Sequence, residues 1–277
     1  MKKSLSLLLV LALILGIFAL VGCSGDDDEN ANAVTVAVIV STTFGDLSFN
    51  DSAKAGGEAL RADLDLDVEY IECNGENYKQ QMMQAADTHD IVVPVGWEFY
   101  EITEAAKEYP DTKFIWVDNV VDGVEQYPNL LCITYAQNEG SFLAGYAAAR
   151  MSATGVIGAV AGDESATIAD FLIGYEQGAA YADPSVKVET AYTNTFDDVQ
   201  AGKQCAQSLA AKHADIIFQA AGRSGNGVFA AAKAGGFYAI GVDQDQKLSA
   251  KEYDDVIICS VVKKVGDSIY DVIKDYT

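Results

Sequence analysis

Short, continuously apolar segments rich in β-branched residues recur along this chain, each separated from the next by a helical stretch. VTVAVIV at 34–40, DIVVPVG at 90–96 and KFIWVD at 113–118 are examples. A strand that is apolar at successive positions is covered on both faces, as happens in parallel sheets flanked by helices. The pattern therefore predicts an α/β fold made of doubly wound parallel sheets.

The pattern runs through the chain twice, which predicts an N-terminal lobe over 34–150 and a C-terminal lobe over 151–277. A chain of this length has room for two cores. Two such lobes joined by a hinge are typical of binding proteins that enclose a ligand. Strands are expected at 34–40, 67–73, 90–96, 113–118 and 130–135, then at 156–162, 186–192, 214–222 and 237–243. Helices are expected at 50–62, 78–88, 98–108 and 138–151, then at 168–180, 198–212 and 225–235, with another beginning near Val265.

The first 22 residues have the composition of an export signal. Lys2 and Lys3 precede an apolar run at 5–21, and the run closes with the sequence LVGC, in which the cysteine is Cys23. A basic start, an apolar stretch and small residues at its end are typical of a cleaved signal. The cysteine after a small residue resembles the lipobox of bacterial lipoproteins, so we expect a lipid on Cys23. An uncleaved membrane anchor is the alternative, because the run is nearly long enough to span a bilayer.

Residues 23–33, which follow this signal, are acidic and contain few apolar side chains, so we expect a disordered tether. Loss of residues 1–22 removes Lys2 and Lys3 and takes the formal charge from −23 to −25. So acidic a chain is repelled by nucleic acid and by anionic lipid headgroups, which excludes both as expected partners.

The remaining cysteines, Cys73, Cys132, Cys205 and Cys259, show neither CxxC spacing nor a zinc pattern. Outside the cytoplasm a disulfide and separate buried thiols are both compatible with these positions. We expect no metal site and no cofactor.

Polar and aromatic side chains follow the predicted strands at their carboxyl ends, the edge where open parallel sheets bind ligands. A carboxylate there can accept two hydrogen bonds, from vicinal hydroxyls or from the N–H edge of a base. An aromatic ring there can stack on a flat ligand. The sequence therefore predicts a ligand with both a ring and hydroxyl groups. The residues at these ends include Ser41, Thr42, Thr43, Asp46, Phe49, Asn50, Trp97, Asp118, Gly222 and Asp243.

Several of these stretches together resemble one family, the basic membrane proteins, which are substrate-binding lipoproteins of ABC transporters. The resemblance is carried from about residue 34 to the end by SFND, FIWVDN, NEGSFLAGYAAA, GYEQGA, AAGRSGNGVFAAAKAGGFYAIGVDQDQ and CSVVKK. It implies the type I periplasmic binding protein fold, with two lobes and a hinge. The best-understood members take up purine nucleosides, which implies a nucleoside ligand here.

The resemblance also implies roles for individual residues. Phe49 would stack on the purine and Asn50 would hydrogen-bond its edge. Asp118 would bind the base, Asp243 would hold the ribose hydroxyls, and Lys263 would assist there. On the residues alone, Phe49 could instead belong to the core, the two aspartates could be helix caps, and Lys263 could lie at the surface.

Three further positions complete the implied site. Gly222 would offer a backbone contact. Phe218 would supply the second face of the aromatic sandwich unless the alternation of its strand buries it, and Trp97 is the alternative. Because GRSGNG is not followed by GK[ST], this glycine-rich turn is not expected to bind phosphate.

The chain departs from the family pattern in two places within the site. The family has a Thr-Asp-x-Gly-Gly stretch after the first strand, whereas this chain has STTFG at 41–45 and lacks that carboxylate. Ser41 can still hydrogen-bond a ligand, but it cannot chelate a diol. Arg223 stands where the family has a second glycine, either at the rim of the cleft or in solvent. The family pattern also continues beyond residue 277 with a strand and a helix, which leaves open whether the second lobe is truncated.

Catalysis is not expected. His89 and His213, the only histidines, are placed in helix-to-strand connections away from the strand ends, and there is no GxSxG stretch. The sequence predicts a monomeric, lipid-anchored, extracytoplasmic receptor that delivers a purine nucleoside or similar nucleoside to an ABC permease and its ATPase. A sugar receptor of the same fold, a surface adhesin and a ligand sensor are the alternatives.

Overall fold

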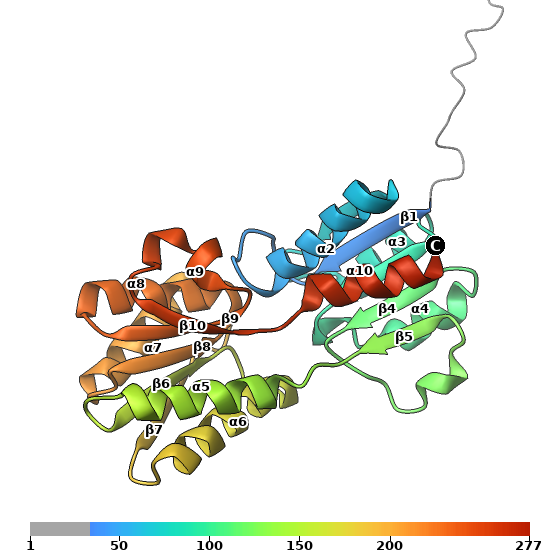
Figure 1. Ribbon diagram of the computed structural model, residues 1–277. Helices are drawn as coiled ribbons and strands as arrows, with labels where there is room; N and C mark the ends of the chain where they lie inside the picture. Colours follow the sequence, from blue (N-terminus) through green and yellow to red (C-terminus); the bar gives the residue numbers. More distant parts are fainter. Residues whose placement is uncertain (1–33) are drawn as a thin grey trace, which may run out of the picture. The chain divides into compact units, whose positions relative to one another are not determined.

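The computed structural model describes residues 34–277, which form two five-stranded sheets with helices on both faces (Figure 1). The expected signal at 1–22, the tether at 23–33 and Cys23 lie outside the described residues. Every adjacent strand pair within both sheets is parallel. The predicted α/β fold with two doubly wound sheets is thereby confirmed.

The first sheet has the strand order β2-β1-β3-β4-β5. Its strands are β1 (Thr35–Val40), β2 (Asp67–Glu72), β3 (Ile91–Val95), β4 (Lys113–Val117) and β5 (Leu130–Ile133). The helices packed on it are α2 (Phe49–Leu64), α3 (Tyr78–Ala86), α4 (Ile102–Glu108) and α10 (Val265–Tyr276).

Strand β1 shows why these segments are apolar at every position. Val36, Val38 and Val40 point into the core shared with α2 and α10, whereas Ala37 and Ile39 point into the core shared with α3 and α4. All five are fully buried. Since successive strand residues face opposite sides of a sheet, only a continuous apolar run fills both cores.

The second sheet has the order β10-β9-β8-β6-β7 and repeats this architecture. Its strands are β6 (Val156–Ala161), β7 (Lys187–Tyr192), β8 (Ile216–Ala220), β9 (Tyr238–Asp243) and β10 (Ile257–Val262). Helices α5 (Gln137–Met151) and α6 (Ala166–Ala182) cover one face, and α7 (Val199–Ala211) and α8 (Asn226–Gly235) cover the other. The short helix α9 (Gln246–Ser249) packs against β9 and β10.

Two helices lie on different sheets from those that the sequence boundaries assigned to them. Helix α5, expected in the lobe 34–150, packs on the second sheet through Ala144 and Ala148. Helix α10, expected in the lobe 151–277, packs on the first sheet (Figure 1). Its apolar stripe of Val265, Ile269 and Ile273 is fully buried there, so packing rather than chain order decides where it lies.

The described chain thus passes between the sheets twice, at residues 134–136 before α5 and at Lys263–Lys264 before α10. Among residues 34–277, no helix is long and apolar enough to cross a membrane. The four cysteines in this range form no disulfide with one another.

Candidate functional site

A cavity lies where the carboxyl ends of the two sheets face each other, and it holds about 730 Å³ of free space including its open mouth. The predicted residues that line it are Ser41, Phe49, Asn50, Trp97, Asp118, Gly222, Asp243 and Lys263. Residues from both sheets therefore converge on one space, although they are far apart in the sequence.

Phe218 is the exception among the predicted site residues. Its side chain is fully buried in the core of the second sheet, in a tilted contact with Tyr175 at 5.2 Å between ring centroids. Ala220 lies on the same face of β8 but two residues nearer its carboxyl end, so Ala220 lines the cavity whereas Phe218 lies deeper in the core. The prediction that Phe218 faces the ligand is therefore wrong.

The loop after β1 is held by Asp46, which caps helix α2. One carboxylate oxygen accepts hydrogen bonds from the backbone N–H groups of Ser48 and Asp51, and the other accepts from that of Asn50, at 2.9–3.0 Å. Burial raises the pKa of Asp46, and these three N–H donors oppose that rise. Asp46 lines the cavity, but its carboxylate oxygens already accept these hydrogen bonds. Its main role is therefore to hold Phe49 and Asn50 in place at the start of α2.

The Asn50 side chain is also anchored to this loop. Its amide nitrogen donates to Thr42 Oγ1 at 3.1 Å and to the carbonyl of Thr43 at 2.9 Å. The amide oxygen is then the atom with which Asn50 can accept a hydrogen bond from a ligand.

At one end of the cavity, Lys263 and Asp118 form a buried ion pair with 2.5 Å between Nζ and Oδ2. The Lys263 ammonium also lies 5.1–5.4 Å from the ring centroids of Phe49, Tyr135 and Phe171. Burial raises the pKa of Asp118, and the charge of Lys263 works against that rise. Lys263 is thus buried in the site, not at the surface.

Asp243 lies at the same end and accepts a hydrogen bond from Ser48 Oγ at 2.5 Å. Burial raises the pKa of Asp243 to about 7, although Lys263 and Ser48 favour the ionised form. Both Asp118 and Asp243 have left-handed backbone conformations, with φ of 69° and 65°. A non-glycine residue seldom adopts this conformation, and it is found preferentially at ligand sites.

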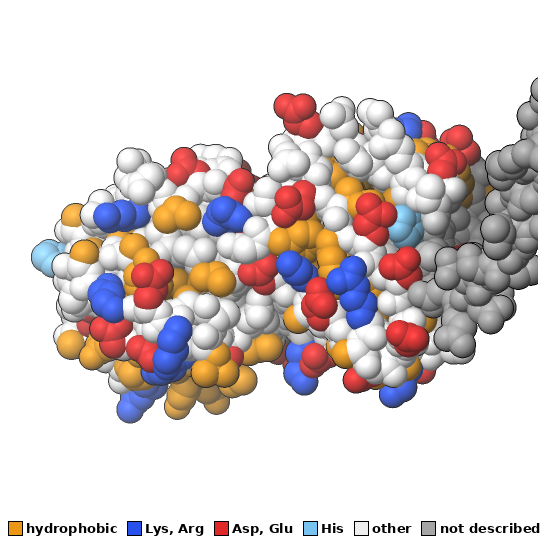
Figure 2. Space-filling model, turned by 90° about the horizontal axis from the view of Figure 1, so that it is seen from above, with side chains coloured by type: hydrophobic (Ala, Val, Ile, Leu, Met, Phe, Trp, Pro, Cys, Tyr) orange, Lys and Arg blue, Asp and Glu red, His pale blue; other side chains and the backbone are white. Residues whose placement is uncertain are grey.

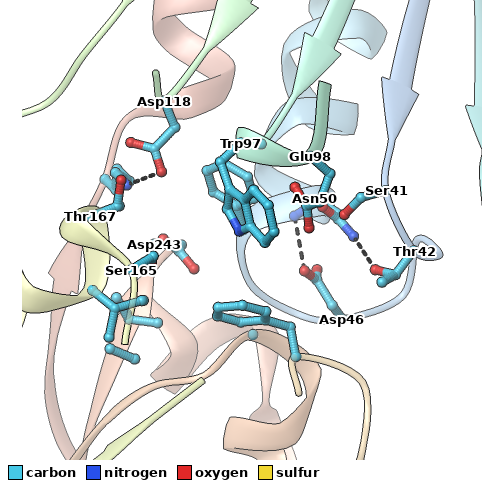
Figure 3. Close-up of a pocket in the computed structure, with 18 of the residues that line it drawn as sticks. Ser41, Thr42, Asp46, Asn50, Trp97, Glu98, Asp118, Ser165, Thr167 and Asp243 are labelled. Atoms are coloured by element: carbon cyan, nitrogen blue, oxygen red, sulfur yellow. Dashed lines mark hydrogen bonds and ion pairs between the residues drawn. The ribbon is translucent and has the colours of Figure 1, made fainter. Parts of the chain in front are cut away.

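The other end of the cavity carries Ser41, Thr42, Asn50 and Glu98, and Trp97 lies between the two ends in the close-up view (Figure 3). Trp97 lines the cavity and is 44% exposed, so its ring is accessible to a ligand. Phe49 is half-buried and packs against the core between the first sheet and helices α2 and α10. It also lines the cavity, so it is both a packing residue and a cavity residue.

Sequence reasoning missed several residues of this cavity. Phe196 comes from the loop after β7, and Ser165, Thr167 and Phe171 come from the start of α6. Ser165 Oγ is buried without a hydrogen-bond partner in the described chain, which suits a ligand contact. The one usable signal was position, because the loops after β6 and β7 end at the same sheet edge as the others.

The loop between β1 and α2 is tied to the second sheet's loops by several hydrogen bonds. Arg223 Nη2 donates to Thr43 Oγ1 at 2.9 Å and to the carbonyl of Phe44 at 2.8 Å. Its Nε lies 2.9 Å from a carboxylate oxygen of Asp197. The Asn226 amide donates to the Asp46 carbonyl at 2.9 Å, which adds a further bond across the cleft. Arg223 therefore lies at the cleft rim and bridges the two sides.

Residues 33–277 match the protein family described as ABC transporter substrate-binding protein PnrA-like. The chain belongs to this family. It is 36% identical to basic membrane protein D of Borreliella burgdorferi (strain JD1) over 93% of this chain and 76% of that protein. It is 33% identical to basic membrane protein A of B. burgdorferi (strain ATCC 35210 / DSM 4680 / CIP 102532 / B31) over 94% of this chain and 77% of that protein.

A solved structure agrees with this membership. An ABC transporter solute-binding protein from Aeropyrum pernix K1 superposes with a TM-score of 0.80 at 29% identity, over 87% of this chain and 70% of that one. The predicted family and the type I binding-protein fold are confirmed. Members of the family are substrate-binding proteins of ABC transporters rather than enzymes, so the chain is assigned to ligand capture for transport.

Proposed function

We propose that this protein binds a purine nucleoside, or a closely similar nucleoside, in the cavity between its two sheets. The observation that carries the proposal is the order of chemistries along the cavity. Asp118, Asp243 and Lys263 are at one end, and aromatic rings are in the middle. The hydroxyl and amide groups of Ser41, Thr42 and Asn50 lie with Glu98 at the other end.

A nucleoside has the matching order of groups. Ribose hydroxyls both donate and accept, and Asp243 with Lys263 offers an acceptor beside a donor. The purine ring would stack between aromatic walls that include Phe49 and Trp97. The family resemblance implied that Asp118 binds the base, but Asp118 pairs with Lys263, so we propose that it acts at the ribose end.

The charge of the cavity supports an unphosphorylated ligand. Asp46, Glu98, Asp118 and Asp243 line it, whereas Lys263 is its only lysine or arginine among the described residues. A phosphate would be repelled by this arrangement because four carboxylates face one ammonium in a partly buried space.

Isothermal titration calorimetry of residues 34–277 with inosine, guanosine, adenosine, cytidine and free ribose tests the proposal. We expect purine nucleosides to bind, and both Phe49→Ala and Asp243→Ala to weaken binding more than tenfold. Binding of a free sugar with no binding of any nucleoside would instead identify a sugar receptor. An absence of binding by all five compounds would favour an adhesin or a sensor of another ligand.

We further propose that the protein is anchored on the extracytoplasmic face by a lipid on Cys23 and hands its ligand to an ABC permease and ATPase. The family membership supports the transporter partners, and the LVGC sequence supports the lipid. In cells fed a labelled fatty acid, the wild-type protein should incorporate label and a Cys23→Ala protein should not. An unlabelled wild-type protein that remains in the membrane would point to an uncleaved anchor.

A further inference from the structure

Glu98 is a cavity residue to which the nucleoside proposal has given no role. It lies in the short 3₁₀ helix Trp97–Phe99 that follows β3, next to the exposed Trp97. The carboxylate turns back over the end of the strand, so that a Cβ added to Gly96 would lie 2.5 Å from Glu98 Oε2. Figure 3 shows Glu98 beside Ser41 and Asn50, at the end of the cavity away from Asp118 and Asp243.

The Glu98 carboxylate has no cationic partner in the described chain and few hydrogen-bond donors around it. No lysine, arginine or histidine in the described chain lies within 4.0 Å of it, in contrast to the Asp118 carboxylate at the other end. Burial raises the pKa of Glu98, and the Ser41 hydroxyl and a backbone N–H only partly oppose this rise. A buried carboxylate without a cation is costly unless N–H donors reach it.

We propose that Glu98 reads the Watson–Crick edge of the bound base and makes the protein prefer guanine nucleosides over adenine nucleosides. This inference rests on the proposed nucleoside function. A base that stacks on Trp97 would bring its edge toward Glu98, since both side chains line the cavity and Trp97 lies between the Asp118 end and the Glu98 end (Figure 3). The hydroxyls of the sugar are better matched by the other end, where Lys263 supplies a cationic donor and the Glu98 end has none.

The preference follows from the donors that each base presents. Guanine offers N1–H and N2–H₂ side by side, and both can bond to the two oxygens of one carboxylate, while the Thr42 hydroxyl, which accepts from Asn50, can donate to O6. Hypoxanthine keeps N1–H but lacks the N2 amino group. Adenine presents the N1 lone pair toward the same position, where it faces an acceptor, so one group on each side is left unpaired.

Calorimetry with guanosine, inosine and adenosine, on the wild type and on Glu98→Gln, tests this inference. The wild type should bind guanosine most tightly, inosine less tightly and adenosine at least tenfold more weakly than guanosine. Glutamine has nearly the same shape, but it presents one acceptor and one donor, which match the N6 amino group and N1 of adenine. The ratio of adenosine to guanosine dissociation constants should therefore fall at least tenfold in Glu98→Gln.

Glu101→Gln is the matched control, because it removes the same charge three residues along the chain. Glu101 pairs with Lys79 at 3.1 Å and does not line the cavity. The ratio of adenosine to guanosine dissociation constants in Glu101→Gln should stay within twofold of the wild-type value. Equal affinities of the wild type for the three nucleosides, or an unchanged ratio in Glu98→Gln, would overturn the role of Glu98 and leave the nucleoside proposal in place. Failure of the wild type to bind any nucleoside would remove both.

Discussion

At the scale of single residues, the site holds buried carboxylates whose charge is poorly compensated before a ligand arrives. Asp243 is the clearest case, because burial raises its pKa to about 7 and Ser48 gives it a single short hydrogen bond. Asp118 differs in having Lys263 as a direct partner. Both aspartates also have left-handed backbones, a conformation that costs about 1 kcal/mol or more. The site therefore gives up folding free energy for groups that a ligand can use.

This arrangement predicts a pH dependence for the ligand-free protein. The folded-state pKa of Asp243 lies above its unfolded value of about 4, so the folded state binds the extra proton between these values. The stabilisation that protonated Asp243 gives the folded state is therefore fully present below about pH 4 and is lost as the pH rises through 7. At pH 8, the free energy of unfolding of Asp243→Asn should exceed that of the wild type by about 1–3 kcal/mol. At pH 4 this difference should be much smaller.

Urea denaturation of ligand-free protein at pH 4 and pH 8 measures this difference. Asp271→Asn is the control, since Asp271 is exposed on α10 and has no ion-pair partner in the described chain. If the Asp243→Asn variant gains the same free energy of unfolding at both pH values, Asp243 does not titrate between pH 4 and pH 8.

At the scale of elements, helices α5 and α6 approach each other closely enough to exclude side chains at three glycines. A Cβ at Gly145 would lie 1.9 Å from the carbonyl oxygen of Tyr175, and one at Gly178 would lie 1.9 Å from that of Phe142. Gly174 is similarly close to Asn138.

The GSFLAGYAAA and GYEQGA stretches thus fit this helix pair because the backbones themselves are in contact. This close packing fixes the start of α6, which carries Ser165, Thr167 and Phe171 to the cavity.

Gly178→Ala should therefore lower the free energy of unfolding, by about 1–3 kcal/mol, because the added methyl group must push the two helices apart. Gln177→Ala changes the neighbouring exposed position on the same helix and should have little effect. Urea unfolding followed by far-ultraviolet circular dichroism compares the two variants. Equal stability of Gly178→Ala and the wild type would show that α5 and α6 can separate without cost.

At the scale of the whole molecule, the described structure is held closed across the cleft by hydrogen bonds from the second sheet's loops to the β1–α2 loop. Besides Arg223 and Asn226, the amide of Gln246 donates to the carbonyl of Leu47 at 2.8 Å, and that of Gln244 donates to the carbonyl of Ser48 at 2.8 Å. These contacts need no ligand, so they favour closure by themselves. A ligand that contacts both sides would favour the same closed state further.

Arg223→Ala should shift the ligand-free protein toward an open form and weaken ligand binding about three- to tenfold, mainly through faster dissociation. Stopped-flow measurement of Trp97 fluorescence would give the dissociation rate, and small-angle scattering would report the opening. Arg150→Ala is the control, because Arg150 is exposed on α5 and does not reach the cleft. An unchanged dissociation rate would mean that Arg223 contributes nothing to closure.

The amino-acid sequence by itself determined the α/β class, the positions of every described strand except β10, and the edge at which the site forms. It could do so because a strand buried on both faces must be apolar throughout, as β1 is, and because parallel strands end at a common edge. Only the tertiary structure decided which side chains face the cavity and which sheet each helix covers. Phe218 turned into the core, Glu98 turned into the site, and α10 returned to the first sheet. These outcomes depend on contacts between residues far apart in the chain, which no local pattern of residues specifies.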